Sequence, residues 1–387
     1  MNCAEQRPGQ KIVILEKGRK VLAKVKISGG GRCNVTHACF TPRDLIAFYP
    51  RGSKALLGPF HRFCTSDTVA WFEERGVETK IEQDGRMFPI TDDSQTIINC
   101  LWRGVRKHQI EVLTNHRVAI IRPVADHWEV QLSDDRIWCA PKVLCATGSS
   151  PAFWKILQTL GHRIVPPVPS LFTFNIDDER LRDLPGLSVP HAKVKIIGSK
   201  LQSEGPLLIT HWGLSGPAVL KLSAWGARQL HERAYDFRIL VNWLGEQSAE
   251  EVMDQLMAIR QSIPKKQILT KAPFELPSRL WKQLVLATGL PGERRWAELG
   301  NKALKKMAHQ LTAAEFAVKG KSTFKEEFVT AGGIDLKEVN FKTFESKLFK
   351  GLHFAGEVLD IDAVTGGFNF QAAWTGAWIA AQAMAES

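Results

Sequence analysis

The sequence has no long hydrophobic run, no paired cysteines and no regular spacing of metal ligands. No apolar stretch approaches the roughly 20 residues that a membrane-spanning helix needs, and the first residues lack the pattern of a signal peptide. The 7 cysteines are odd in number and none lies in a C-x-x-C pair, which predicts reduced thiols and a cytoplasmic location. The 11 histidines include no H-x-x-x-H pair, so we expect no metal site.

A nucleophilic serine motif is also missing. Ser215 follows Gly213-Leu214, but Pro217 stands where G-x-S-x-G would need its second glycine, so serine-hydrolase chemistry is disfavoured. What is present is ordinary for a globular protein. The 387 residues are 44% hydrophobic and 24% charged, and this length is enough for two or three domains with a substantial core.

The most informative part of the sequence is Gly351–Trp378. His353–Ala355 is predicted to be a short apolar strand that Gly356-Glu357 ends, and Thr365-Gly366-Gly367 opens a helix over Phe368–Ala385. Two glycines at a helix start let a planar ligand approach free backbone N–H groups. The positive end of the helix favours anions, including a reduced flavin ring. The alternative is an ordinary glycine turn before an alanine-rich packing helix.

Three segments nearer the amino terminus point in the same direction. Lys11–Glu16 is typical of a buried parallel strand whose terminal carboxylate binds ribose hydroxyls in a Rossmann-type fold. Ile27–Asn34 contains three glycines beside Arg32, and backbone N–H groups with a guanidinium suit phosphate. A flexible glycine hinge is the alternative there. Lys142–Ala146 is a third apolar strand, which Thr147-Gly148 ends sharply.

Together these segments resemble the BaiN/YhiN-like FAD-dependent flavoproteins over nearly the whole chain. The motifs are ILEKG, ISGGGRCN, ATGSSP, THWGLSGP and the carboxy-terminal GEVLDID, TGGFNFQ and AW pattern. The resemblance implies an α/β fold with a Rossmann-like FAD-binding domain split between both chain ends, 1–166 and 328–387. It also implies an inserted β-rich, barrel-like domain over 167–244 and an inserted helical region over 245–327.

The resemblance further implies which residues contact FAD. Glu16 would hold the adenosine ribose, and the backbone of Val118 would meet the adenine. Gly356 and Glu357 would meet the ribitol or the pyrophosphate. The other contacts would come from three turns. The first would lie along the pyrophosphate and isoalloxazine, with Ser28, Gly29, Gly30, Gly31, Arg32, Cys33 and Asn34. The second, at a strand end, has Ala146, Thr147 and Gly148, and the third has Asp360 together with Gly366, Gly367 and Asn369, which would face the pyrimidine edge of the flavin.

Catalytic residues are less well marked, because flavin carries hydride chemistry itself and the protein need only position the substrate and supply a proton. His211, beside the Gly213–Pro217 turn, is the first candidate, with a structural role in that turn as the alternative. His37 and Arg86 are further candidates. Cys33 is interpreted as a packing residue rather than a redox thiol, and the lack of a paired dithiol argues against the disulfide-reductase branch of flavoenzymes.

The predicted function is a FAD-dependent oxidoreductase that takes electrons from transiently bound NAD(P)H and acts on an unsaturated or carbonyl-conjugated small molecule. The alternative is a flavin-binding, or formerly flavin-binding, interaction protein with a basic face. Residues 257–306 carry eleven Lys and Arg against three Asp and Glu, within a net charge of +11. Three interpretations account for this charge: a solvated surface, a guide for an anionic substrate and a nucleic-acid-binding patch. The nucleic-acid patch is the least favoured, because only two aromatic residues, Trp281 and Trp296, lie among the basic residues.

One expected element is missing from the sequence. No G-x-G-x-x-G turn connects a strand to a helix, and residues 1–5 read as the end of the first helix of the fold. The missing strand and turn would form the centre of the sheet and the main pyrophosphate cradle. We therefore expect that the start is assigned too late or that the sequence is a fragment, and the alternative is a natural truncation that has lost FAD. In each case we expect the chain as written to bind FAD weakly.

Overall fold

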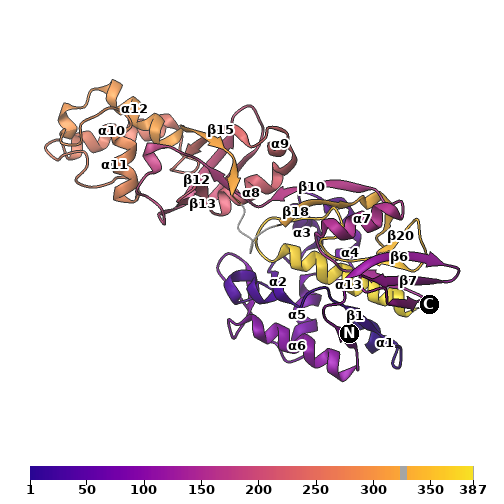
Figure 1. The fold of residues 1–387 in the computed structure, drawn as a ribbon. Coiled ribbons are helices and arrows are strands. Elements are labelled where there is room, and N and C mark those ends of the chain that lie inside the picture. Colours follow the sequence, from indigo (N-terminus) through magenta and orange to yellow (C-terminus); the bar gives the residue numbers. More distant parts are fainter. Residues whose placement is uncertain (323–328, 387) are drawn as a thin grey trace. The chain divides into compact units, whose positions relative to one another are not determined.

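The computed structural model describes residues 1–322 and 329–386 (Figure 1). The chain divides into two compact units, unit 1 with Met1–Val168 and Val329–Ser387, and unit 2 with Pro169–Phe328. The first boundary was expected after residue 166, and the division follows Val168. The second expected boundary, at residue 328, lies outside the described residues.

Unit 1 contains two pairs of short parallel strands, and each pair includes one strand from near an end of the chain. β1 (Val13–Leu15) pairs with β5 (Glu111–Leu113), and β9 (Val143–Cys145) pairs with β21 (Leu352–Phe354). The second pair continues through β20 (Glu345–Ser346) to β19 (Val339–Asn340) in a four-stranded sheet. The apolar runs before Glu16, Ala146 and Ala355 therefore form strands as predicted. The prediction that the first of them is buried was wrong, because β1 belongs to a two-stranded sheet and its Ile14 is 41% exposed.

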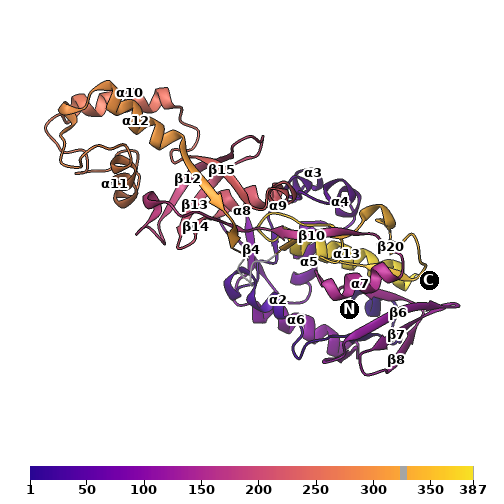
Figure 2. The ribbon, with the colours of Figure 1, turned by 45° about the horizontal axis from the view of Figure 1, so that its top comes forward.

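The helix α13 runs over Phe368–Ala385, with the limits that the sequence predicts. In both views it passes through the middle of unit 1 (Figure 1; Figure 2). It packs against α1, α4, α5, β2 and β21, so an alanine-rich sequence suits it because neighbours approach from several sides. The other helices of unit 1 are α1 (Asn2–Gln6), α2 (Ala23–Ile27), α3 (Pro42–Leu45), α4 (Ser53–Phe60), α5 (Thr65–Glu73), α6 (Ser94–Lys107) and α7 (Pro151–Thr159).

Two small antiparallel sheets complete unit 1. The first has the order β2-β4-β3, formed by Thr36–His37, Arg86–Pro89 and Thr79–Ile81. The second is an antiparallel meander, with β6 (Val118–Val124), β7 (His127–Leu132) and β8 (Ile137–Ala140). Along β7 every second side chain is buried, which is the period of a strand with one face in the core.

The proline-rich segment differs from its prediction. Three prolines among the four residues Pro166–Pro169 predict an interruption of any regular element. However, β10 covers Ile164–Ser170 and pairs with β18 (Val329–Ile334) in a two-stranded sheet. Proline has a backbone angle compatible with extended structure and is tolerated where a strand edge needs no N–H donor. The prediction of an interruption was therefore wrong.

Unit 2 combines a seven-stranded sheet with helices. The sheet has the order β16-β15-β12-β13-β14-β11-β17. Its strands are β11 (Thr173–Asn175), β12 (Ser188–Ile196), β13 (Gln202–Thr210), β14 (Gly213–Ser215), β15 (Asp236–Asn242), β16 (Ala314–Lys319) and β17 (Lys321–Ser322), and its helices are α8 (Pro217–Trp225), α9 (Ala227–Glu232), α10 (Ala249–Ser262), α11 (Ser278–Leu286) and α12 (Asn301–Thr312).

The region expected to be helical is shorter than predicted. Helices α10, α11 and α12 follow the sheet strand β15, but Ala314–Lys319 returns to the sheet as β16 and pairs with β15. Burial alternates along β16, so its period of two, rather than the neighbouring helical pattern, decides its structure. Among the described residues no helix is long and apolar enough to cross a membrane.

Candidate functional site

The carboxyl ends of the parallel strands β9 and β21 lie side by side. The Ala355 N–H donates to the Cys145 carbonyl at 3.1 Å, so the turns at Thr147-Gly148 and Gly356-Glu357 leave the sheet at the same edge. The Glu357 carboxylate lies 2.6 Å from the Lys24 ammonium and 3.5 Å from the Ser149 hydroxyl. Ligands in open α/β sheets bind at this edge.

The glycine loop Ser28–Gly31 has a backbone that only glycine adopts easily. Gly29, Gly30 and Gly31 have φ values of 57°, 69° and 86°. A Cβ on Gly29 would lie 2.9 Å from the Asn34 nitrogen, whereas a Cβ on Gly30 or Gly31 would meet nothing within 4 Å. The first glycine therefore packs against the protein, and the next two leave open space beside the backbone.

Asn34 joins this loop to the carboxy-terminal segment. When the side-chain amide is oriented so that every group has a complementary partner, its nitrogen donates to the carbonyls of Thr36 at 2.8 Å and Met87 at 3.1 Å, and its oxygen accepts from the Gly367 N–H at 2.9 Å. A Cβ on Gly367 would lie 2.5 Å from the Thr36 oxygen. The two chain ends thus meet at the start of α13, where the sequence placed flavin contacts from both.

Several side chains fix the start of α13. The buried Tyr49 hydroxyl donates to the Phe368 carbonyl at 2.6 Å, and burial raises the pKa of this phenol. The Thr36 hydroxyl donates to Gln371 Oε1 at 2.6 Å. Asn369 accepts from the Ala363 N–H at 3.0 Å and donates to the Ala363 carbonyl at 3.2 Å. The side-chain amide of Asn369, a predicted flavin contact, therefore binds the loop before α13 through both its oxygen and its nitrogen.

Two of the predicted catalytic residues are neighbours in unit 1. His37 of β2 and Arg86 of β4 face each other in the antiparallel register. The His37 ring stacks on Phe368 with centroids 4.5 Å apart, and a Cβ on Gly366 would lie 3.3 Å from its Cδ2. The structure therefore brings the His37 imidazole to the glycines at the start of α13, whereas the Arg86 guanidinium pairs with Glu82 and Asp84.

Arg32 and Arg86 share one carboxylate. Glu82 accepts from Arg32 at 2.5 Å and from Arg86 at 3.0 Å, and the Arg32 guanidinium lies 3.9 Å from the Phe88 ring centroid. The Glu82 hydrogen bond raises the pKa of Arg32. Arg32 is thus neutralised in this structure, and an anionic ligand would compete with Glu82 for it.

Glu16 lies at the other parallel pair. Its carboxylate accepts from the Gly18 N–H at 2.6 Å, and its carbonyl accepts from the His116 N–H at 2.8 Å. Val118, the first residue of β6, follows two positions later and pairs with Leu132. The expected ribose and adenine contacts are therefore close together in space, although they are far apart along the chain.

His211 belongs to unit 2, on the turn between β13 and β14, and its side chain is exposed. The neighbouring Trp212 is 57% exposed, and the Thr210 hydroxyl donates to the Gly213 carbonyl at 3.2 Å. His211, the first candidate for the proton donor, is therefore not among the residues that meet in unit 1, and its catalytic role stays a prediction.

Cys33 is fully buried with a positive φ of 62°. Burial raises its pKa to about 11 and that of Cys145 to about 12, whereas Cys139 is exposed. These values leave little thiolate at Cys33, as expected for a packing residue.

We expect iodoacetamide to alkylate native protein at Cys139 long before Cys33 or Cys145 at about pH 8, because only the thiolate reacts. Because a raised pKa keeps the thiol protonated, the relative rate at Cys33 should rise as the pH approaches 11. Mass spectrometry of the digested protein measures both rates. Equal labelling of Cys33 and Cys139 at pH 8 would show that Cys33 is accessible and ionised.

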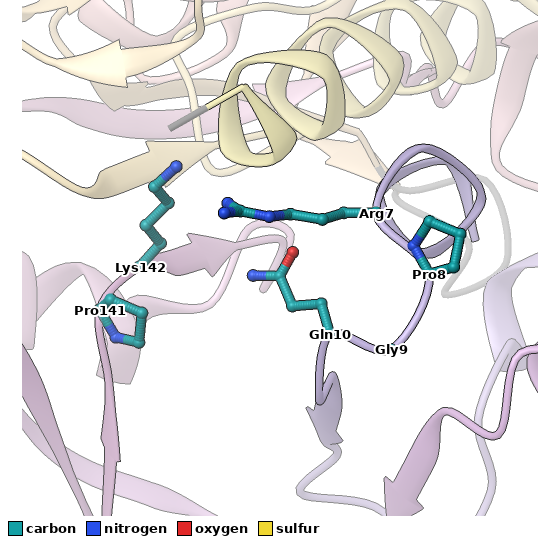
Figure 3. Close-up of a pocket in the computed structure, with 6 residues that line it drawn as sticks. All are labelled: Arg7, Pro8, Gly9, Gln10, Pro141 and Lys142. Carbon is teal, nitrogen blue, oxygen red and sulfur yellow. The ribbon is translucent and has the colours of Figure 1, made fainter.

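A cavity of about 540 Å³ lies before the starts of β1 and β9, opposite the edge described above, and is lined by Arg7, Pro8, Gly9, Gln10, Pro141 and Lys142. In Figure 3 the side chains of Arg7 and Lys142 point toward the end of a helix. Lys142 donates to the Met384 carbonyl at 2.7 Å and Arg7 to the Ala385 carbonyl at 3.5 Å. Cations stabilise the carboxyl end of a helix, so these side chains act as caps of α13.

The meander contains one group of possible metal ligands. His127, Glu129 and Cys139 place ligand atoms within 4.8 Å of one another. However, the Arg122 guanidinium lies 2.6 Å from Glu129, and its positive charge opposes a bound cation. The expectation that the protein holds no metal is not tested by this arrangement.

The sequence did not reveal the ion pair between Arg51 and Asp362. Asp362 is 0% exposed and Arg51 is 12% exposed in their side chains, and two guanidinium nitrogens donate to the two carboxylate oxygens. The partners are 311 positions apart, and no local spacing signals such a contact. The pair joins the loop before α4 to the loop before α13.

Comparison with known proteins agrees with this arrangement. Residues 1–383 match the family described as HI0933-like protein Rossmann domain. The chain belongs to this family. The match confirms the predicted BaiN/YhiN-like relationship and the α/β class with a Rossmann-like domain, and it places the chain among FAD-dependent oxidoreductases.

Curated relatives span almost the same length. The ribosomal RNA dihydrouridine synthase of Haemophilus influenzae is 28% identical over 98% of this chain and 94% of its own. The protein of the same name from Escherichia coli is 27% identical over 97% and 92%. The 3-dehydro-bile acid delta(4,6)-reductase of Clostridium scindens is 23% identical over 97% and 93%.

Solved structures with related folds include a flavocytochrome c3 fumarate reductase, with a TM-score of 0.49 and 14% identity over 100% of this chain and 76% of that chain. The 3-ketosteroid-delta4-(5alpha)-dehydrogenase of Rhodococcus jostii has a TM-score of 0.48 and 12% identity over 98% and 93%. Because both scores are modest, the family assignment rests on the sequence match.

Proposed function

We propose that the chain is a FAD-dependent reductase of a carbon–carbon double bond conjugated to a carbonyl group, and that its substrate is a uracil base in ribosomal RNA. The observation that carries the reductase proposal is the meeting of Ser28–Asn34 with Gly366-Gly367 at the start of α13. Both glycine segments offer backbone N–H groups to one planar, electron-accepting ligand.

The residues of unit 1 fit FAD at three places. Glu16 would hold the ribose hydroxyls, the open backbone at Gly30 and Gly31 would lie along the diphosphate and ring, and the start of α13 would face the ring edge that becomes negative on reduction. The bound group would supply hydride chemistry, with NAD(P)H as the proposed electron donor. No described set of residues resembles a second dinucleotide fingerprint, so we propose that NAD(P)H binds transiently.

The names of the relatives point to one type of reaction. Dihydrouridine differs from uridine by two hydrogens across a double bond that is conjugated to a carbonyl group. The bile acid relative is named as a reductase of double bonds in a 3-oxo compound. In both cases a hydride adds to the carbon far from the carbonyl and a proton adds to the near carbon, so the substrate gains two electrons and two hydrogens.

In this reaction the chain must bind the carbonyl group and deliver a proton. We propose His37 as the proton donor, because its ring stacks on Phe368 beside Gly366, and Arg86 as the cation that favours charge on the substrate carbonyl. His211 is the second candidate for the proton donor, from unit 2.

RNA is preferred over a small conjugated ketone for two reasons. The two relatives with the higher identities are named for a reaction on ribosomal RNA. The chain also has a net charge of +11, which suits a polyanion more than a steroid.

The test is reduction of ribosomal RNA by the purified protein with FAD and NADPH. We expect dihydrouridine to appear in the nuclease digest, as measured by mass spectrometry, and NADPH consumption to depend on RNA. His37→Gln should lower the rate about 10²–10⁴-fold at unchanged FAD content if His37 donates the proton. His231→Gln, on an exposed histidine of α9, is the matched control and should not change the rate.

The same assay separates the alternatives. If a 3-oxo steroid with a conjugated double bond supports NADPH oxidation and RNA does not, the RNA substrate is wrong and the reductase chemistry stands. If neither is reduced although FAD is bound, the proposed reaction is wrong.

A further inference from the structure

The positive charge of unit 2 is concentrated in its helices. Residues 257–306 carry eleven Lys and Arg against three Asp and Glu, whereas the rest of unit 2 carries twelve against fourteen. Helices α10, α11 and α12 gather at one end of unit 2, beyond the sheet strands (Figure 1; Figure 2). The excess charge therefore lies on one part of this unit rather than around it.

Helix α12 has one apolar face in the core and an opposite face that carries positive charge. Leu304, Met307, Ala308 and Leu311 are at most 2% exposed and form the core stripe. Lys302, Lys305, Lys306 and His309 are exposed and have the same spacing, shifted by two residues. A shift of two residues is about 200° around a helix, so the cations form a continuous stripe on the face opposite the core.

These cations have no acidic partners among the described residues. Ten of the eleven side chains are exposed, and none of the ten lies within ion-pair distance of a described carboxylate. They are Lys265, Lys266, Lys271, Arg279, Lys282, Arg294, Arg295, Lys302, Lys305 and Lys306. By contrast, elsewhere in unit 2 Lys193 pairs with Glu246 at 2.7 Å and Arg238 with Glu315 at 2.7 Å.

The stripe borders a hollow in the surface. A cavity of about 260 Å³ lies between α12 and the end of α11, lined by Ala287, Thr288, Lys306, His309 and Gln310. Its lining combines an ammonium, an imidazole and an amide, which suit phosphate or sugar oxygens. The charge is thus arranged around a concave feature as well as along a helix.

The aromatic residues of this region do not reach the surface. Trp281 and Trp296 are each 1% exposed and stack on each other with centroids 6.3 Å apart. They cannot stack on nucleic-acid bases, as the aromatic platforms of single-strand binders do. Recognition by this face would depend on phosphates, which gives affinity without sequence selectivity.

We propose that this basic face of α11, α12 and the loops between α10 and α12 docks the phosphate backbone of folded RNA, an inference that rests on the proposed RNA substrate. The face supplies affinity and holds the RNA on unit 2, and the choice of base is made elsewhere in the protein. Its contribution is electrostatic and weakens with salt.

The test compares two triple variants of the full chain loaded with FAD. Lys302→Gln, Lys305→Gln and Lys306→Gln remove three cations from α12, where glutamine has nearly the helix propensity of lysine. Lys195→Gln, Lys200→Gln and Lys319→Gln remove three exposed cations of the same unit outside this face. Binding to a ribosomal RNA transcript is measured by fluorescence anisotropy over a range of salt concentrations.

We expect the α12 variant to bind RNA roughly 10- to 100-fold more weakly at about 0.1 M salt, with a salt slope shallower by about 2 to 3. The control variant should bind like the unchanged protein. Reduction of FAD by NADPH, which needs no RNA, should be equal in all three.

Four outcomes are distinct. If the α12 variant binds RNA normally while the unchanged protein forms dihydrouridine, the docking face is wrong and the proposed function stands. If both variants lose affinity equally, only overall charge matters and the docking face is again wrong. If α12-dependent binding occurs without dihydrouridine formation, the docking face stands and the proposed reaction fails. If the unchanged protein binds no RNA but binds acidic peptides or anionic vesicles, the RNA partner is wrong.

Discussion

Replacing Gly367 with alanine is expected to lower the free energy of unfolding of the protein by roughly 3–5 kcal/mol and to weaken FAD binding. Gly367 has a left-handed φ of 90°, and a Cβ there would lie 2.5 Å from the Thr36 oxygen, which is backbone and cannot move aside alone. The start of α13 would have to shift away from the Ser28–Asn34 loop, and the proposed flavin site would open.

Gly9→Ala is the matched control for this effect. Gly9 has a similar φ of 86°, but a Cβ there would meet nothing within 4 Å. It should therefore show only the cost of a left-handed alanine, about 1–2 kcal/mol, and keep FAD. Urea unfolding and the flavin absorbance of the purified variants measure both. Equal losses for Gly367→Ala and Gly9→Ala would mean that close approach at Gly367 does not matter.

Asp362→Asn is expected to destabilise the protein by about 3–5 kcal/mol, because it removes the negative charge from a largely buried ion pair. The loop that leads to α13 would loosen, so FAD affinity should fall together with stability. Unfolding by urea measures the first effect and a FAD titration measures the second. Glu315→Gln, which breaks an exposed pair with Arg238, serves as the control and should change little.

A double variant distinguishes charge from packing. Arg51→Met with Asp362→Leu removes both charges and keeps apolar volume, and such replacements are often neutral. We expect it to recover most of the stability that Asp362→Asn loses. If the double variant is as unstable as Asp362→Asn, the two side chains act through other contacts and not mainly through their charges.

Much of unit 1 could be predicted because its signals are local. The limits of α13 follow from two glycines before an apolar run, and β1, β9 and β21 follow from short apolar segments that each end in Gly, Glu or Thr-Gly. The meeting of both chain ends at Asn34 and Gly367 was implied only by the family resemblance, since nothing local connects residues so far apart in the chain.

The remaining features depend on tertiary structure. The pairing of His37 with Arg86 needs the register of β2 and β4, which no turn between them specifies. The ion pair of Arg51 with Asp362 needs two loops to meet. Pro166 and Pro167 predict an interruption of regular structure from the sequence alone. The unpaired strand edge that accommodates these prolines is a property of the folded β10–β18 sheet, and the sequence does not show it.

The most direct test of the account is amide hydrogen exchange of the protein with and without FAD. If both chain ends build one flavin site, FAD should slow exchange in Ser28–Asn34 and in Gly366–Phe370 together, and leave Gly9–Lys11 beside the α13 cap unchanged. Protection of only one of the two glycine segments, or protection confined to the cavity at Gln10 and Lys142, would contradict it.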